Sequence, residues 1–215
     1  MADQGMRDWR NLCGVLAGPV FVVTFLIEGE TRAGYNALRH PVSSLALSDL
    51  GWTQVINFLV TGTLLAIFAT GLWSQAKWAA IFIGLAGIGL VGAGFFPTDP
   101  LSGYPPGTPD QIVYTTTGTA HDLFSMLFFL GLPLAAIGFA IRFFRTGRRL
   151  AGIYGLLSAV GFLLLFVIAA VGFTQTPGFV EWGGLFQRLS LVIGFAWITV
   201  SALSFRKNGI PVPAE

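Results

Sequence analysis

Two histidines and a few carboxylic acids are the residues of this chain that could serve catalysis or metal binding. His121 and Asp122 open the stretch "TAHDLFSMLFFLGLPLAAIGFAI", residues 119–141, which is otherwise mostly apolar. On a helix Ser125 shares a face with His121 and lies within one turn of Asp122. A histidine, a carboxylate and a serine could supply a general base, its orienting partner and a nucleophile. Such groups need a scaffold that holds them at the mouth of an apolar helix.

Other polar residues also occur at the ends of apolar segments. Asp99 in "FFPTDP" follows one apolar run, Glu28 ends another, and Gln187 and Arg188 in "GLFQRL" lie about one turn inside the last. An arginine buried in lipid is costly, so it normally faces the interior of a helix bundle and has a partner there. We therefore expect an acid, either Glu28, Asp99 or Asp122, beside Arg188.

The composition is that of an integral membrane protein. Of the 215 residues 54% are hydrophobic and only 10% are charged, with a mean hydropathy of +0.74. A membrane-spanning helix needs about 20 predominantly apolar residues. We therefore predict an all-α fold, a single membrane domain over residues 1–215, built as a bundle of six transmembrane helices at about 11–28, 53–73, 78–96, 120–142, 150–172 and 183–204.

The first apolar run is interpreted as a helix and not as a secretory signal. Asp3 and Asp8 precede it, and no small-residue cleavage site follows it. Cys13 comes before the hydrophobic stretch, which argues against lipid attachment, and as the one cysteine it forms no internal disulfide.

Charge sets the expected orientation. With six spans both termini lie on one side, and nine of the 12 lysines and arginines fall on that side. The positive-inside rule therefore predicts cytoplasmic N- and C-termini, with the inner arginines attracting anionic lipid headgroups. Seven of the 10 acids and both histidines fall on the outer side, so any chemistry faces outward. No basic surface interleaved with aromatic residues suggests nucleic acid as a partner.

The connections differ in length between the two sides. The inner ones are short, whereas the outer ones, 29–52 and 97–119, have the length of functional or disordered loops. Within the first of these, "HPVSSLALSDLGW", residues 40–52, predicts a short interfacial helix that forms a lid. Five glycines in the third span predict that this helix lies at the centre of the bundle. Pro19 and Pro133 inside spans predict kinks that widen a cavity.

Each candidate residue also has an ordinary structural explanation. Thr119 and Asp122 fit a helix-start capping box, and Asp99 fits a turn in which it bonds its own backbone. An acid-paired Arg188 would lock the last helix to its neighbours. Ser43 and Ser44 could cap the interfacial helix, and His40 before Pro41 fits an exposed loop residue. What favours a functional site is the gathering of these groups at one end of a chain otherwise nearly free of charge.

Four motifs carry a resemblance to a known family. "RAGYNALRHPVSSLALSDLGWTQVINF", "FFPTDP", "TAHDLFS" and "GLFQRL" together resemble a bacterial and archaeal membrane family catalogued as domain of unknown function 998, over about residues 11–205. The resemblance implies the cytoplasmic membrane of a prokaryote and supplies no activity. The six-span layout is more distantly similar to the Frag1, DRAM and Sfk1 group, some of whose members are linked to lipid handling.

The chain also resembles, superficially, the ceramidase-like membrane hydrolases, which place zinc among histidines, an aspartate and a serine. With only two histidines here, a three-histidine site cannot form within one chain. Zinc or another divalent metal would need His40, His121 and one or two carboxylates such as Asp99 or Asp122. Such a metal could activate water for hydrolysis of an ester or amide in a lipid headgroup. Haem ligation by the two histidines is disfavoured because one of them lies in a surface loop.

The expected function is to bind, and in an enzymatic version to hydrolyse, a lipid or lipid-linked molecule in an outward-facing polar pocket. A serine nucleophile, Ser43 or Ser125, is an alternative within this class. Other classes are a non-catalytic lipid-binding, sensor or accessory protein, and a small-solute carrier, which would place charges near the bilayer midplane. In the enzymatic version the catalytic residues are His121, Asp122 and Asp99, and the substrate-binding residues are Arg188, Gln187, Glu28 and Ser125.

Overall fold

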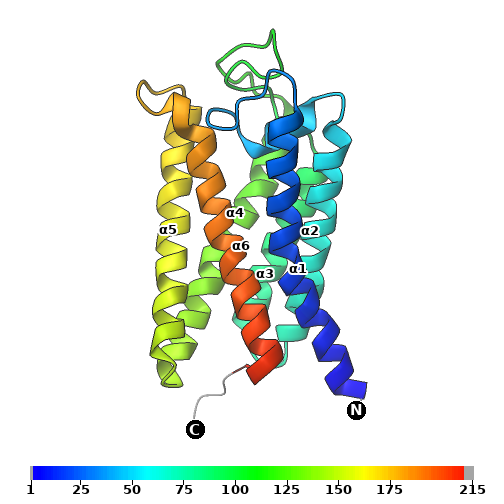
Figure 1. The fold of residues 1–215 in the computed structure, drawn as a ribbon, viewed down its shortest axis with the longest axis vertical. Coiled ribbons are helices and arrows are strands. Elements are labelled where there is room, and N and C mark those ends of the chain that lie inside the picture. The colour runs from blue at the N-terminus through cyan, green and yellow to red at the C-terminus, as the bar shows by residue number, and fades with distance from the viewer. Residues whose placement is uncertain (1, 211–215) are drawn as a thin grey trace.

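The chain folds into a bundle of long helices (Figure 1). The computed structural model describes residues 2–210, with the side chains of residues 9–207 and 209–210. Within this part, two short 3-10 helices, η1 and η2, lie in the connections between six helices that are each long and apolar enough to cross a membrane. The predicted all-helical membrane class is therefore confirmed. The elements are α1 (Ala2–Thr31), η1 (Val42–Leu47), α2 (Gly51–Leu72), α3 (Lys77–Phe95), α4 (Thr116–Arg145), α5 (Arg149–Phe173), η2 (Val180–Trp182) and α6 (Gly183–Asn208).

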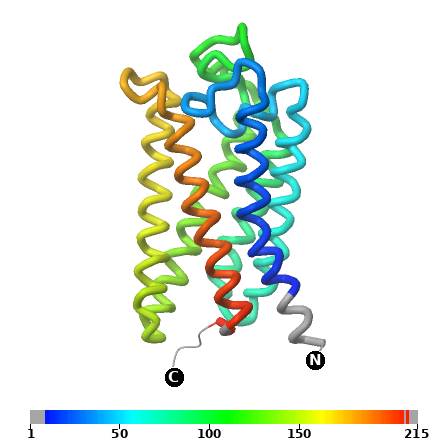
Figure 2. Tube along the Cα trace, in the orientation of Figure 1, coloured from blue at the N-terminus to red at the C-terminus, as the bar shows by residue number. Residues whose placement is uncertain are grey.

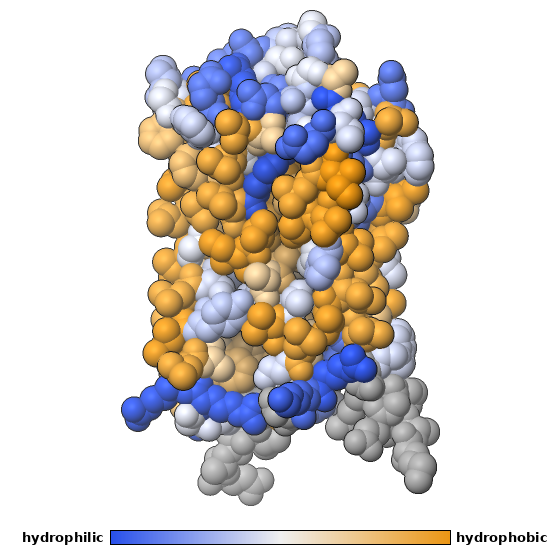
Figure 3. Space-filling view, in the orientation of Figure 1, coloured by the Kyte–Doolittle hydropathy of each residue, from blue (hydrophilic) through white to orange (hydrophobic). Residues whose placement is uncertain are grey.

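The two ends of the bundle differ in shape and charge. The connections 32–50, 96–115 and 174–182 gather at one end, here called the loop end (Figures 1 and 2). α1 begins and α6 ends at the opposite end, here called the terminal end. Figure 3 shows a hydrophobic band between two hydrophilic ends. Exposed basic residues such as Arg145, Arg149 and Lys207 belong to the terminal end, as the charge pattern predicts.

The six helices close into a ring in sequence order. Each packs chiefly against its neighbours in the chain, and α1 packs against α6 to close the circle. The predicted central position of α3 is therefore wrong, because α3 packs between α2 and α4. Its glycines instead allow close backbone approach on those two sides. A Cβ on Gly87 would lie 2.7 Å from the carbonyl oxygen of Gly62 in α2, and one on Gly89 would lie 2.6 Å from that of Phe124 in α4.

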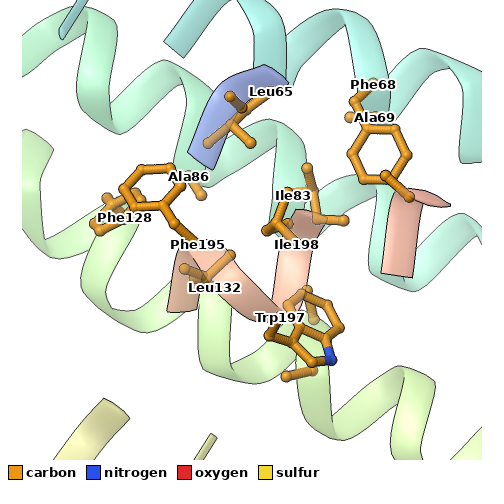
Figure 4. Packing of buried hydrophobic residues seen from close by; sticks show 14 of the residues in the cluster. Leu65, Phe68, Ala69, Ile83, Ala86, Phe128, Leu132, Phe195, Trp197 and Ile198 are labelled. Atoms are coloured by element: carbon orange, nitrogen blue, oxygen red, sulfur yellow. The ribbon is translucent and has the colours of Figure 1, made fainter. Parts of the chain in front are cut away.

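Aromatic side chains fill the inside of the ring. The Phe21 ring of α1 lies 5.8 Å from that of Phe58 in α2 and 4.8 Å from that of Phe195 in α6, which in turn is 5.5 Å from that of Phe128 in α4. Buried aliphatic and aromatic residues continue this core, among them Leu65, Ile83, Leu132, Trp197 and Ile198 (Figure 4). The buried charged side chains of the described part all lie nearer the loop end. This placement is the opposite of what a solute carrier would need at the midplane.

A small crevice lies beside one of the two helix-interior prolines. Pro133 in α4, Ser158 in α5 and Trp197 in α6 are among the residues that line this small, partly open space. Proline prevents a regular helical hydrogen bond and spaces its helix from its neighbours. None of the residues that line the crevice is charged.

The close contact of α2 with α3 predicts a specific cost for added volume. Gly87→Ala should lower the free energy of unfolding by about 1–3 kcal/mol, because its Cβ would overlap backbone atoms of α2. Gly138→Ala is a matched control, since a Cβ there meets nothing within 4 Å. It should leave stability unchanged or raise it by up to about 1 kcal/mol, because alanine favours helix. Chemical unfolding in detergent checks both variants, and equal stabilities would contradict the packing described.

Candidate functional site

Arg188 in the second turn of α6 is bonded to the loop that follows α1. Its Nη1 donates to the carbonyl oxygens of Ala37 at 2.6 Å, His40 at 3.0 Å and Gly184 at 3.0 Å, and its Nη2 donates to the hydroxyl of Tyr35. The predicted acid partner is therefore wrong. Converging carbonyl dipoles, together with the ring faces of Phe25 and Tyr35 at 5.8 and 5.4 Å, stabilise the buried cation instead.

Tyr35 extends this contact. Burial raises the pKa of its hydroxyl to about 12, so the group keeps its proton. It accepts from Arg188 and donates to the carbonyl oxygen of Pro41 at 2.9 Å. Its ring packs edge-on against Tyr104 at 5.1 Å. No sequence pattern singled out Tyr35, because its role depends on an arginine about 150 residues away.

The sequence suggested that His40 is an exposed loop residue. In the structure it is instead buried and connects two loops. It is 5% exposed, and its Nδ1 accepts from the backbone N–H of Asn36 at 2.9 Å. The ring proton must then lie on Nε2, which donates to the carbonyl oxygen of Ser102 at 3.2 Å. Burial lowers the pKa of this imidazole below its ordinary value of 6.5, although the bond to Ser102 opposes the shift. Both ring nitrogens are used, which leaves no lone pair for a metal.

Ser102 joins all three loops of the loop end. Its carbonyl oxygen also accepts from Arg39 Nε at 3.2 Å, and its hydroxyl accepts from Gln175 Nε2 at 2.8 Å. Arg39 in addition forms ion pairs of 2.8 Å with both Asp110 and Glu181. We call the three loops joined in this way the loop-end cap.

Asp99 holds the start of α4. Its Oδ2 accepts from the backbone N–H of Thr115 at 2.8 Å, and its Oδ1 accepts from the Thr115 hydroxyl at 2.7 Å. Thr115 is itself the N-cap, accepting from the Gly118 N–H at 3.0 Å. The predicted capping by Thr119 and the predicted turn closed by Asp99 are both wrong. Because this pair supplies the cap, the helix begins four residues earlier than expected.

His121 lies between α2, α3 and α4. Its Nδ1 donates to the carbonyl oxygens of Ala93 at 3.0 Å and Phe96 at 2.8 Å, where α3 ends, and its ring packs edge-on against that of Phe58. The residue is 3% exposed, and its Nε2 makes no hydrogen bond to the described residues. Asp122 next to it is exposed, and Ser125 one turn further is half-buried.

The remaining candidates lie near the buried helix η1. Gln187 Oε1 accepts from the backbone N–H of Val42 at 2.8 Å and so holds the start of η1. Ser43 and Ser44 make no side-chain cap there, because Pro41 is the N-cap residue. The predicted interfacial helix exists as η1, but it packs against α1, α2 and α6 and is partly buried. Glu28 of α1 pairs with Arg32 at 3.6 Å, and both side chains are 6% exposed.

The candidate residues therefore form separate groups. Arg188, Gln187 and His40 hold the first loop, whereas Asp99 and His121 hold the junction of α3 with α4. Within the residues that the structure describes, no three His, Cys, Asp or Glu side chains lie close enough to hold a metal ion. The predicted metal ligands His40, His121 and Asp99 are not brought together. A second set of buried polar residues, Gln54, Asn57 and Thr61, follows one face of α2 and was not predicted. Their helical spacing within an apolar span could have indicated a polar helix face inside the bundle.

The hydrogen bonds of Arg188 predict that its replacement destabilises the fold. Arg188→Gln should lower the free energy of unfolding by about 2–4 kcal/mol, because buried carbonyl oxygens lose their donors. Arg39→Gln removes an equally long side chain whose ion pairs involve exposed acids, and should cost about 1 kcal/mol or less. Unfolding in detergent, with hydrogen exchange over residues 35–41, measures both effects. A smaller loss for Arg188→Gln than for Arg39→Gln would contradict the assignment.

The lowered pKa of His40 predicts a pH dependence. Below pH 6.5 the unfolded chain protonates this imidazole more readily than the folded chain does. The free energy of unfolding should therefore be highest above about pH 7 and should fall as the pH is lowered toward about 5. His40→Gln should show a shallower fall over the same range, because its side chain does not titrate. Identical slopes for the two proteins would show that His40 does not cause the effect.

The comparisons with known proteins agree with the sequence resemblance. No curated protein and no solved structure matches the chain. One family, described as a protein of unknown function (DUF998), matches residues 15–204, from the middle of α1 to near the end of α6. The chain therefore belongs to the DUF998 family.

Proposed function

We propose that this chain is a non-catalytic protein of a prokaryotic cytoplasmic membrane that binds a lipid or lipid-linked molecule at its loop end. The observation that carries this proposal is that several of the candidate site residues are already hydrogen-bonded within the protein. Both His40 nitrogens bond to backbone groups, the Asp99 oxygens bond to the N–H and the hydroxyl of Thr115, and the Arg188 guanidinium bonds to carbonyl oxygens and to the Tyr35 hydroxyl. Catalysis or metal binding by these residues would have to compete with the bonds that they already make.

The surface of the bundle supports a lipid as the bound molecule. Figure 3 shows hydrophilic surface that reaches down from the loop end between two hydrophobic areas, on the face where α1 and α6 lie in front. A lipid has the same division, a polar headgroup above apolar chains. Burial of acyl chains along apolar helices and hydrogen bonds to the headgroup would act together there. The basic terminal end favours a cytoplasmic position, which would place the loop end in the outer leaflet.

One observation keeps a hydrolytic version as the second candidate. His121 Nε2 has no hydrogen-bond partner among the described residues, and Asp122 and Ser125 lie on the same part of α4. An imidazole whose Nδ1–H is fixed by backbone carbonyls has the tautomer of a metal ligand or general base. Its burial to 3% exposure weighs against this version, because a substrate would first have to displace the packing around the ring.

Metal and lipid analysis separates the two candidates. We expect detergent-purified wild-type protein and His121→Ala to retain phospholipid and to hold no stoichiometric transition metal. Elemental analysis and extraction of lipid from the same samples measure both quantities. A near-stoichiometric metal that disappears in His121→Ala would overturn the non-catalytic proposal. Complete loss of lipid from the folded wild-type protein on mild detergent exchange would argue against lipid binding.

A further inference from the structure

Four buried side chains at the loop end carry polar atoms without a hydrogen-bond partner among the described residues. One is Arg32, at its Nε, and the other three are Glu28 of α1, Ser44 of η1 and Gln54 of α2, which are 5%, 0% and 0% exposed. Both carboxylate oxygens of Glu28, the Ser44 hydroxyl and Gln54 Nε2 make no hydrogen bond to a described residue. Buried polar groups are nearly always hydrogen-bonded, to protein or to ordered water, because an unmade bond is costly in an apolar setting.

These side chains belong to elements that meet. η1 packs against both α1 and α2. Asn57 of α2 faces α1, since its Nδ2 donates to the carbonyl oxygen of Phe21 at 3.2 Å. Gln54 is one turn nearer the loop end on the same face, at about one helical turn from the level of Glu28. The Gln54 amide is also oriented, because its Oε1 accepts from Asn57 Nδ2 at 3.1 Å and its Nε2 is left to donate elsewhere.

The neighbouring groups do not complete the bonding of Glu28. Arg32 lies at 3.6 Å from the carboxylate, but its Nη2 donates to the Leu50 carbonyl oxygen at 3.0 Å and to the Thr53 hydroxyl at 2.5 Å. Thr53 lies beside Glu28 as well, and its hydroxyl donates to Leu50 at 2.9 Å. The ion pair therefore balances the charge of Glu28, but neither Nη2 nor the unpaired Nε of Arg32 donates a hydrogen bond to its oxygens.

The partner that fits must both donate and accept. Glu28 offers acceptors, Gln54 Nε2 offers donors, and Ser44 offers either. A cation is disfavoured, because Arg32 already balances Glu28 and Arg188 lies close to the neighbouring Gly29. An additional anion would be repelled by the carboxylate. A neutral hydroxyl group satisfies both sides at once.

We propose that Glu28, Ser44 and Gln54 form a binding site for a hydroxyl group, supplied either by a buried water molecule or by the headgroup of a lipid. The hydroxyl donates to Glu28 and accepts from Gln54. If a lipid supplies the hydroxyl group, the inference rests on the proposed function. If water supplies it, the inference is independent of that function. The polar face of α2 ends at Thr61, whose hydroxyl lies 3.4 Å from Asn57 Oδ1, and Leu65 below it is buried in the apolar core. The site therefore belongs to the loop-end half of the bundle.

Solid-state NMR of protein carrying ¹⁵N-labelled glutamine, asparagine and tryptophan tests the site in bilayers of phosphatidylcholine and of phosphatidylglycerol, whose headgroup carries hydroxyls. The Gln54 side-chain signal is assigned by its absence from Gln54→Leu. We expect magnetisation to reach it from water or from headgroup protons several times faster than it reaches the Trp197 indole N–H, which is buried in the apolar core at 1% exposure. Thr63→Val, which removes an exposed hydroxyl of the same helix, should leave the transfer unchanged.

The two sources give different results. Transfer from water in both lipids identifies bound water, and this result stands even if no lipid co-purifies with the protein. Transfer from glycerol headgroup protons, with preferential retention of phosphatidylglycerol that is lost in Gln54→Leu, identifies a lipid hydroxyl. Transfer from neither source in wild-type protein overturns the site. Because that measurement needs only wild-type protein, it holds even if Gln54→Leu folds poorly, the Gln54 signal then being assigned through its bond to Asn57.

Discussion

The loop end depends on one buried cation and the carbonyl oxygens that surround it. The Arg188 side chain extends from α6 at the level where the surroundings become apolar. A guanidinium is tolerated there only if its N–H groups donate hydrogen bonds to other groups. The carbonyl oxygens of Ala37 and His40 meet this need, and the loop after α1 is thereby fixed. Fixing the loop also fixes the His40 ring, whose Nε2 reaches Ser102 in the next connection. A chain of hydrogen bonds thus runs from the Arg188 guanidinium of α6, through His40, to Ser102 in the next connection.

The membrane explains why backbone groups dominate these contacts. Six helices satisfy their own amides, but the connections between them carry free carbonyl and N–H groups close to an apolar region. Polar side chains at the helix ends bond to those groups: His121 to the end of α3, Asp99 to the start of α4, and Gln187 to η1. An ionisable side chain near a membrane surface is for this reason an ambiguous sign of chemistry, since the same residue types serve to close helix ends.

The sequence predicted the fold better than the site because the two depend on different kinds of information. Long apolar runs indicate the spans and the distribution of arginines indicates the basic end, and both can be located along the sequence without knowing any contact. The partners of Arg188 and Asp99 did not follow, because backbone groups occur at every residue and leave no mark in the sequence. Glycines in α3 did signal close packing, but a ring and a central helix require the same small residues. The glycine pattern therefore predicted that α3 packs closely against its neighbours, but not that the six helices form a ring.

The distribution of satisfied and unsatisfied groups gives the best guide to function. Around Arg188, His40 and Asp99 the donors and acceptors are bonded within the protein, as expected of a rigid cap. Around Glu28 and Gln54 they are not, although these side chains are at least as buried. Stability alone would favour replacing such unpaired groups by apolar ones of similar shape. A carboxylate kept without donors beside an amide kept without an acceptor is more readily explained by a third group that bonds both, so the loop end combines a fixed cap with an incompletely bonded interior beneath it.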